Sequence, residues 1–135
     1  MRQDISWWCF QGRLEPKRLI AEAKRIGYEG FELVPEPMWD AIKEAEMHIV
    51  THGGHGTIEN GMNDPRNHSR IEDELKANID KAVKYEIPIL ICFSGNRRGR
   101  PDEEASRTLP LASSASPPTP NRRALRSRWN SSTAR

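Results

Sequence analysis

The sequence predicts an α/β domain built on a parallel sheet of four strands. Short apolar segments alternate with helix-like segments in the order βαβαβαβ, which is typical of parallel sheets with helical crossovers. The segment 87–93 (IPILICF) is an unbroken apolar run, as expected of a strand covered on both faces. After Glu104 the 135-residue chain changes to Ser, Pro, Ala and Arg. We therefore expect residues 1–104 to fold and residues 105–135 to form a disordered tail.

The first unit is a strand at residues 4–10 (DISWWCF) followed by a helix. In an extended strand Trp7 and Trp8 point to opposite faces, so one is expected in the core, and the other, Trp8, is a candidate to line a sugar pocket. Pro16 suits the first helical turn and Gly27 the C-cap. The buried face of this helix is predicted by four apolar side chains at helical spacing: Leu19, Ile20, Ala23 and Ile26.

Three more segments continue the pattern. A strand at 30–34 (GFELV) precedes a short helix at 37–45, and a strand at 47–51 runs into the glycine-rich sequence THGGHG.

A long helix then precedes the final strand at 87–93. Asp64 and Pro65 resemble its N-cap and first turn, and Ser69 with Glu72 forms an alternative capping box slightly later. Apolar residues at four-residue intervals predict the buried stripe of this helix: Ile71, Leu75, Ile79 and Val83.

Four strands cannot close a parallel barrel of eight, so the sheet is either small and open or about half of something larger. Functional groups of parallel sheets gather at the carboxyl ends of the strands. Four segments follow those ends in this chain: Cys9–Gln11, Leu33–Glu36, His52–Gly56 and Ser94–Arg97.

The net charge of +2 hides two opposed parts. Residues 105–135 carry six Arg and no acid, whereas residues 1–104 have 15 basic and 19 acidic side chains. The basic total is therefore no argument that the folded part binds nucleic acid. Cys9 and Cys92 lie in apolar runs and are expected to be buried thiols of a reducing compartment. No leader-like or membrane-spanning run is apparent, so we expect a cytoplasmic protein without membrane partners.

The motif THGGHG is the strongest local signal. His52 and His55 lie three residues apart in a loop directly after a strand, and the glycines between them allow the backbone to approach a ligand closely. Imidazoles in this position can bind a metal or the oxygens of a polar substrate. The alternative is a turn with solvated histidines.

Two further polar groups follow other strands. Glu32 lies within a predicted strand, where a carboxylate must face a polar site or pair with a base. Ser94, Asn96 and Arg97 follow the last strand and are candidates to bind a phosphate or carboxylate. The alternatives are a structural ion pair for Glu32 and a solvated basic loop for the other three.

Several segments together resemble the xylose-isomerase-like TIM-barrel superfamily of sugar-phosphate isomerases and epimerases. They are DISWWCF, GYEGFELVPE, HIVTHGGHGTIENGMNDPRNHSRIEDEL and IPILICFSGNRRG, and the resemblance is strongest to the hydroxypyruvate isomerase-like subgroup. It covers residues 1–104 and implies that they form the N-terminal half of a (β/α)8 barrel, as its first four β/α units.

The resemblance also implies an activity. Such enzymes move a proton between adjacent carbons of a small hydroxycarbonyl compound through an enediolate, with a pair of Glu residues as proton carriers and a divalent Mg or Mn ion on the substrate oxygens. The metal ligands lie in the second half of the barrel, so this chain is expected to bind no metal and to be an inactive fragment. The implied contacts to a small sugar or keto-acid substrate are Glu32, His52, His55, Ser94, Asn96, Arg97 and Trp8.

A frameshift near Glu104 would explain the change of composition. If one base was lost there, the original frame divides the codons of Trp129 (TGG) and Asn130 (beginning AA) differently. The bases TG then end a codon for Leu, Met or Val, and the bases GAA that follow encode Glu. The family carries a metal-binding Glu at a strand end in this region. The competing interpretation is a genuine Ser/Pro/Arg-rich extension.

Two other functions remain open. One is a small α/β domain whose basic tail binds nucleic acid or acidic partners, although Trp129 is the tail's only aromatic residue. The other is a metal-dependent endonuclease-like barrel. The acidic balance of residues 1–104 and the absence of a His in CFSGN count against it.

Overall fold

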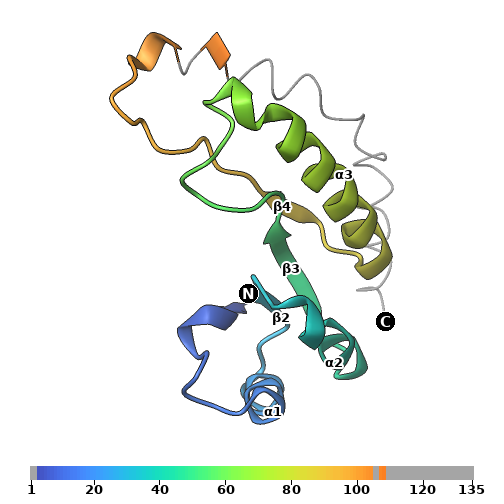
Figure 1. Ribbon diagram of the computed structural model, residues 1–135. Coiled ribbons are helices and arrows are strands. Elements are labelled where there is room, and N and C mark those ends of the chain that lie inside the picture. Colours follow the sequence, from blue (N-terminus) through green and yellow to red (C-terminus); the bar gives the residue numbers. More distant parts are fainter. Residues whose placement is uncertain (1–2, 105–106, 109–135) are drawn as a thin grey trace. The chain divides into compact units, whose positions relative to one another are not determined.

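The computed structural model describes residues 3–104 together with Arg107 and Thr108, and the rest of the predicted tail lies outside the described residues (Figure 1). The chain divides into two compact units. Among the described residues, the first comprises 3–53 and 81–91, and the second comprises 54–80 and 92–104 with Arg107 and Thr108.

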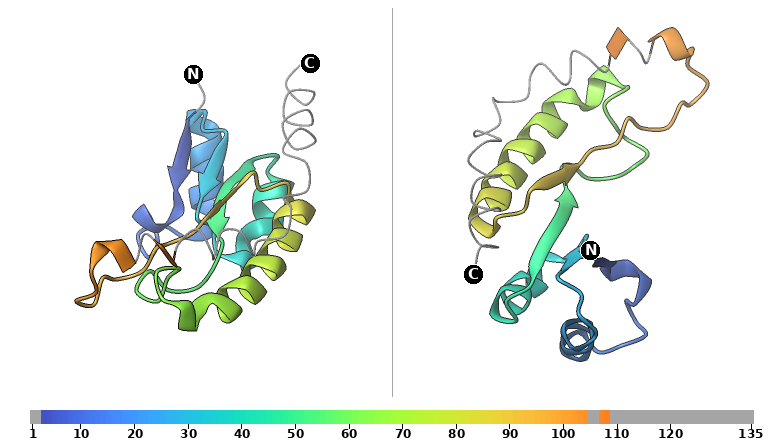
Figure 2. Two further views of the ribbon diagram at one scale, coloured as in Figure 1. Left: turned by 90° about the horizontal axis from the view of Figure 1, so that it is seen from above. Right: turned by 180° about the vertical axis from the view of Figure 1, so that it is seen from behind.

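A four-stranded parallel sheet lies in the first unit, and Figure 2 gives two further views of it. The order along the sheet is β1-β2-β3-β4, and each neighbouring pair is parallel. The predicted α/β class and the four parallel strands in consecutive order are thus confirmed. The strands are β1 (Asp4–Ser6), β2 (Gly30–Glu32), β3 (His48–Gly53) and β4 (Ile89–Ile91).

Three α-helices connect these strands. Helix α1 (Pro16–Ile26) begins after Glu15, whose side chain accepts a hydrogen bond from the backbone N–H of Arg18, and it ends at Gly27 with φ 105°. Only glycine adopts that left-handed conformation without strain. The other two helices are α2 (Trp39–Glu44) and α3 (His68–Tyr85), and residues 81–85 of α3 belong to the first unit.

Short 3-10 helices mark three of the connections: η1 (Trp7–Cys9), η2 (Glu36–Met38) and η3 (Pro65–Asn67). Asp64 caps η3 by accepting a hydrogen bond from the N–H of Arg66, so the predicted helix start is correct, with one 3-10 turn ahead of α3.

One apolar cluster forms the core of the first unit. Its buried members come from β2 and β3, from α1, α2 and the end of α3, and from η1 and the connections beside the strands: Trp7, Leu19, Ile20, Ala23, Phe31, Val34, Trp39, Ile42, Met47, Ile49, Ala82 and Ile87. Phe31 and Ile49 are register partners on β2 and β3, and the Trp7 ring packs edge-on against Phe31 at 5.5 Å. Burial of each such side chain contributes roughly 1.5–3 kcal/mol. Helices α1 and α2 and the end of α3 (residues 81–85) therefore pack on the same face of the sheet.

The opposite face of the sheet carries Gly30. A Cβ atom on Gly30 would lie 2.7 Å from the carbonyl oxygen of His48, 2.9 Å from Oδ1 of Asp4 and 3.1 Å from Cγ2 of Val50. These neighbours are consistent with strand alternation, which directs Gly30 and Val50 away from the cluster that holds Phe31. The absence of a side chain at Gly30 therefore lets β1, β2 and β3 approach closely.

The first predicted strand is too long. It ends at Ser6, and the chain turns into η1, so Trp7 and Trp8 do not alternate as they would in a strand. Trp7 is buried, with 4% of its surface exposed, and Trp8 is 64% exposed. The prediction that Cys9 and Cys92 are buried is wrong, because both lie beyond the ends of their strands and are exposed.

The last strand and two helix stripes also differ from the sequence patterns. β4 spans only Ile89–Ile91, and Ile89 is 50% exposed, so the strand is not covered on both faces. Ile26 at the end of α1 and Val83 near the end of α3 are exposed at 62% and 49%. Leu19, Ile20 and Ala23, and likewise Ile71 and Leu75, are buried as predicted.

Among the described residues, no helix combines the length and the apolar character needed to cross a membrane.

Substitution of Gly30 by Ala is expected to lower the free energy of unfolding by about 1–3 kcal/mol, because the added Cβ meets the backbone oxygen of His48 and cannot be relieved by a side-chain rotation. Urea unfolding followed by far-UV circular dichroism measures this change.

Gly56→Ala is the matched control. Its Cβ would lie 3.6 Å from Glu74, an ordinary contact, and the change is expected to stay within about 0.5 kcal/mol. Equal stability of Gly30→Ala and the wild type would contradict the close strand approach.

Candidate functional site

Glu32 lies at the carboxyl end of β2. Its side chain is half-buried, and its Oε2 accepts a hydrogen bond of 3.1 Å from Oγ of Ser6 on β1. The next residue, Leu33, has φ 53°, and its N–H donates to the carbonyl oxygen of Thr51 on β3. A non-glycine residue in the left-handed region is costly and is often found at functional sites. This turn terminates β2 and holds Glu32 at the strand end.

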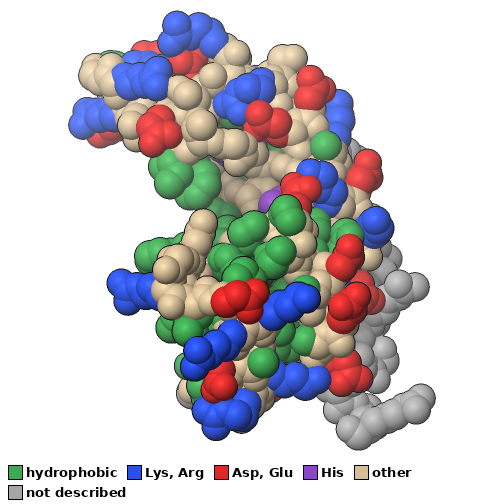
Figure 3. Space-filling model, turned by 60° about the horizontal axis from the view of Figure 1, so that its bottom comes forward, with side chains coloured by type: hydrophobic (Ala, Val, Ile, Leu, Met, Phe, Trp, Pro, Cys, Tyr) green, Lys and Arg blue, Asp and Glu red, His purple; other side chains and the backbone are tan. Residues whose placement is uncertain are grey.

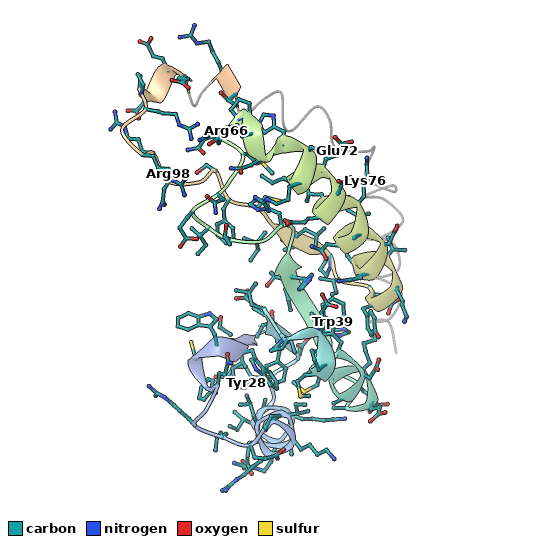
Figure 4. All side chains as sticks on the ribbon, viewed as in Figure 1. Tyr28, Trp39, Arg66, Glu72, Lys76 and Arg98 are labelled. Carbon is teal, nitrogen blue, oxygen red and sulfur yellow. The ribbon has the colours of Figure 1, made fainter. Side chains whose placement is uncertain are left out.

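His52 near the end of β3 belongs to a small polar group beside the core. Oε1 of Glu36 lies 3.7 Å from Nε2 of His52 and accepts a 2.7 Å hydrogen bond from Nζ of Lys81 on α3. The His52 ring packs edge-on against Trp39, with centroids 4.7 Å apart. The indole of Trp39, labelled in Figure 4, donates to the carbonyl oxygen of Val34 and is itself held in place.

This geometry gives His52 a defined orientation and a carboxylate close to one ring nitrogen. The His52 side chain is 17% exposed, so it combines limited access to solvent with a polar partner. Glu36 lies beside this ring, and Lys81 binds the Glu36 carboxylate.

His55 lies in the second unit, where both of its ring nitrogens contact the main chain. Its Nε2 accepts a 2.9 Å hydrogen bond from the N–H of Phe93, and Nδ1 lies 2.8 Å from the carbonyl oxygen of Gly56. Since Nε2 accepts, this pattern assigns the proton to Nδ1 of the neutral ring. The buried His55 side chain thus joins the segment after β3 to the segment after β4.

A second support of the same loop is Glu74 on α3. Its Oε2 accepts 2.7 Å and 2.8 Å hydrogen bonds from the N–H of Gly56 and from Nη1 of Arg70. Desolvation opposes ionisation of this carboxyl, but the bonds from Gly56 and Arg70 outweigh it and lower the pKa of Glu74. The charged form of Glu74 therefore holds the loop that follows His55.

Ser94, Asn96 and Arg97 are mostly engaged through their main chain. The carbonyl oxygen of Ser94 accepts from the N–H of Asn63 at 2.7 Å, and the carbonyl of Asn96 accepts from Nδ2 of Asn63 at 3.1 Å. Nε of Arg97 forms an ion pair of 3.2 Å with Asp102. The Ser94, Asn96 and Arg97 side chains lie at the exposed surface of this segment.

Two glycines allow the segments around residues 61 and 95 to touch. A Cβ on Gly61 would lie 2.3 Å from the backbone nitrogen of Gly95. Gly95 itself has φ 98°, and its Cβ would meet Oδ1 of Asn63 at 2.5 Å. Any side chain at either position would separate the two backbones. The motif SGN therefore serves a close backbone approach.

Asp64 is the most strongly held acid of the second unit. Its Oδ2 accepts 2.7 Å bonds from Nη2 of Arg66 and from Nη2 of Arg100, and Arg66, labelled in Figure 4, also donates through its backbone N–H. The pKa of Asp64 lies far below its usual range because of the Arg66 side-chain bond, with burial opposing and Arg100 assisting. Sequence reasoning identified Asp64 as a cap but missed its two arginine partners and the buried Asn63.

The structure thus distributes the predicted substrate contacts over both units. Glu32 ends β2, His52 lies near the end of β3 and Trp8 lies in η1, all in the first unit, and the other four belong to the second: His55, Ser94, Asn96 and Arg97. None of these predicted roles is tested by the geometry alone, so they stay predictions. The contacts of His55 with the main chain add a structural role that the spacing of the motif did not reveal.

Metal ligation was tested on the same residues. Within the described ranges, no group of three or more His, Cys, Asp or Glu side chains is arranged to hold a metal ion. The described residues therefore do not supply a ligand set for the Mg or Mn ion that the family resemblance implies.

Comparison with known proteins adds no relative: no family model, no curated protein and no solved structure matches the chain.

Substitution of Asp64 by Asn is expected to lower the urea midpoint at pH 7, because the two arginines lose their charged partner. The folded-state pKa of Asp64 lies below its ordinary value of 3.8, so its stabilisation is present above that value and is lost as the pH falls through the lowered pKa. The difference between wild type and variant should therefore narrow below about pH 4. Urea titrations between pH 2 and pH 7 measure it.

Asp102→Asn is the control for this series. Asp102 forms its ion pair with Arg97 at the surface, where such a pair contributes about 0–1 kcal/mol. A pH-independent effect of Asp64→Asn would refute the assigned ion pairs.

Proposed function

We propose that residues 1–104 are the first four β/α units of a (β/α)8 barrel, and that the complete barrel is a metal-dependent isomerase or epimerase of a small sugar or keto-acid. In the 135-residue chain that barrel is incomplete, and turnover is negligible. The proposal combines the sequence resemblance to the hydroxypyruvate isomerase-like subgroup with the architecture of the first unit.

The observation that carries the proposal is the combination of strand order and helix placement. The strands follow one another as β1-β2-β3-β4, and α1, α2 and the end of α3 contribute to one cluster on one face of the sheet. A doubly wound sheet would reverse its strand order and place helices on both faces. A barrel has consecutive strands and all helices outside, so this arrangement supports half of a barrel.

Polar side chains at the carboxyl ends of β2 and β3 support a substrate site at that end. The Glu32 carboxylate has acceptor capacity beyond its bond to Ser6 and can receive a hydrogen bond from a substrate hydroxyl. The His52 ring packs against Trp39 and lies beside Glu36, which places it near the helices, so its contact with substrate stays a prediction from the sequence. Glu32 would then bind and orient the hydroxycarbonyl group.

Proton transfer itself requires residues of the second half. A carbon acid of this type ionises only when charge developing on its oxygens is stabilised, and loss of such stabilisation lowers rates by orders of magnitude. The described residues provide no ligand set for a metal, so no step of the reaction is assigned to one here. The Glu encoded by the shifted codons of Trp129 and Asn130 is proposed to belong to that missing half.

Restoring one base after codon 104 tests the proposal. The repaired reading frame is expected to yield a longer protein that isomerises hydroxypyruvate or a small ketose in the presence of Mn²⁺ or Mg²⁺, because it regains the second half-barrel. The 135-residue chain, assayed in parallel, is expected to show no turnover above background. Coupled spectrophotometric assays and metal titration calorimetry of both proteins give the readouts.

Glu32→Gln in the repaired protein probes the site. Removing the charged acceptor is expected to raise the KM about tenfold or more, as for loss of one charge-assisted hydrogen bond. Glu44→Gln, an exposed change on α2, is the matched control and should leave KM unchanged. Tight Mn²⁺ binding with turnover by the 135-residue chain would show that the half-barrel interpretation is wrong.

A further inference from the structure

The hydrogen bond between His55 and Phe93 has a titratable ring nitrogen as its acceptor. Nε2 of His55 accepts from the N–H of Phe93 at 2.9 Å, and Nδ1 lies 2.8 Å from the carbonyl oxygen of Gly56. A neutral imidazole supplies one donor and one acceptor, whereas an imidazolium supplies two donors. The neutral ring therefore satisfies both main-chain groups, and the imidazolium cannot.

The His55 ring is enclosed where it makes these bonds. His55 is 5% exposed and packs edge-on against Phe93, with ring centroids 6.0 Å apart. On the face of the molecule drawn in Figure 3, charged side chains cover much of the surface and histidine contributes little of it. A partner lost by the buried ring is therefore not readily replaced by water.

The glycine-rich loop that carries this ring is held by α3 on both sides of it. Nδ2 of Asn78 donates to the carbonyl oxygen of Gly54 at 3.0 Å, and the N–H of Gly56 donates to Oε2 of Glu74 at 2.7 Å. Neither bond involves the imidazole. Loss of the bond that the ring accepts would therefore affect the segment that follows β4, while the loop stays attached to α3.

Glu74 and Arg70 are the charged groups of α3 that face this loop. Desolvation opposes ionisation of Glu74, but the bonds from Gly56 and Arg70 lower its pKa. This attachment to α3 therefore stays intact in the pH range where histidines ordinarily titrate. Next to Phe93, partial desolvation raises the pKa of the Cys92 thiol, so that the thiol stays uncharged in the same range.

The other charged side chains of the two joined segments are exposed or have partners of their own. Glu59, on the loop after β3, is exposed. The arginines after β4 bind as follows: Arg97 pairs with Asp102, Arg98 donates to Asn60, and Arg100 pairs with Asp64.

We propose that His55 is a pH-sensitive link, which joins the loop after β3 to the segment after β4 when its ring is neutral and releases that segment when its ring is protonated. Protonation places a hydrogen on Nε2, which then meets the N–H of Phe93 as a second donor. The joined state excludes this proton and the released state accepts it, so a falling pH shifts the population toward the released state. The released segment carries Ser94, Asn96 and Arg97. The inference concerns the 135-residue chain itself and does not rest on the proposed function.

The release is local, because other bonds without a titratable partner also join the two segments. The N–H of Met62 donates to the carbonyl oxygen of Phe93 at 3.1 Å, and the N–H of Asn63 donates to the carbonyl oxygen of Ser94 at 2.7 Å. Protonation of an imidazole leaves these pairs of donor and acceptor unchanged. The loss is therefore expected at the N–H of Phe93 and not at the N–H of Asn63.

Amide hydrogen exchange of the full 135-residue chain, followed by NMR between about pH 5 and pH 8, tests the link. The protection factor, from which the intrinsic pH dependence of exchange is removed, is expected to fall at Phe93 by about tenfold or more as the pH is lowered. The protection factor of Asn63 is expected to stay unchanged. This contrast separates local release from unfolding of the whole unit.

His55→Gln keeps an acceptor at the ε position of the side chain and removes the titration. In this variant the protection of Phe93 is expected to persist and to be independent of pH. His68→Gln is the matched control. Nε2 of His68 lies 2.9 Å from the carbonyl oxygen of Met62, so that ring acts as a donor, and its bond survives protonation. The control should therefore keep the wild-type pH dependence at Phe93.

Long-range proton–nitrogen NMR spectra of the wild-type histidine rings give a readout that requires no variant. At high pH the proton of His55 is expected on Nδ1, and at low pH both ring nitrogens are expected to carry one. The change should occur at the same pH as the loss of protection at Phe93. These wild-type measurements decide the question even where His55→Gln does not fold.

Three results would overturn the proposal. The first is a neutral His55 ring that carries its proton on Nε2. The second is protection of Phe93 that does not change while the His55 ring titrates. The third is a loss of protection that is equal at Phe93 and Asn63, or equal in the wild type and His55→Gln. None of these readouts depends on enzyme turnover, so the link and the proposed function are confirmed or refuted separately.

Discussion

The parallel pairing of β2 with β3 over the apolar cluster is the contact on which the first unit depends. Phe31 and Ile49 are register partners there, and both are almost completely buried. The helices contribute to this same cluster, which determines their common side of the sheet. On the reverse face, Gly30 leaves room for the neighbouring strands, so one pair of strands establishes both the hydrophobic layer and the close strand spacing.

Polar side chains lie at the carboxyl ends of strands β2 and β3. Glu32 and His52 are held by Ser6, Leu33, Trp39 and Glu36 through contacts made by the same strand ends and by the connections between them. The second unit is stabilised in a different way, because its loops have little regular secondary structure. Buried polar groups and glycines join the segments that follow β3 and β4, with His55, Asn63 and Asp64 as the central side chains.

The ends of the sheet connect the fold to the proposed function. Among the described residues, β1 and β4 each pair with one neighbouring strand. In the proposed barrel, further strands would pair with both of these edges. The same proposal assigns the residues of proton transfer to those further strands.

The sequence by itself determined the order of the elements, the limits of α1 and the buried residues Leu19, Ile20 and Ala23, because helix caps and apolar periodicity are local properties. It also placed Glu32 and His52 at strand ends. Tertiary structure decided the rest. The turn after Ser6 exposed Trp8 and Cys9, the short β4 exposed Cys92, and the packing of α1 and α3 left Ile26 and Val83 largely exposed. Phe93, which donates to His55, and Arg100, which donates to Asp64, lie 38 and 36 residues away along the chain, and only folding brings such residues into hydrogen-bond distance.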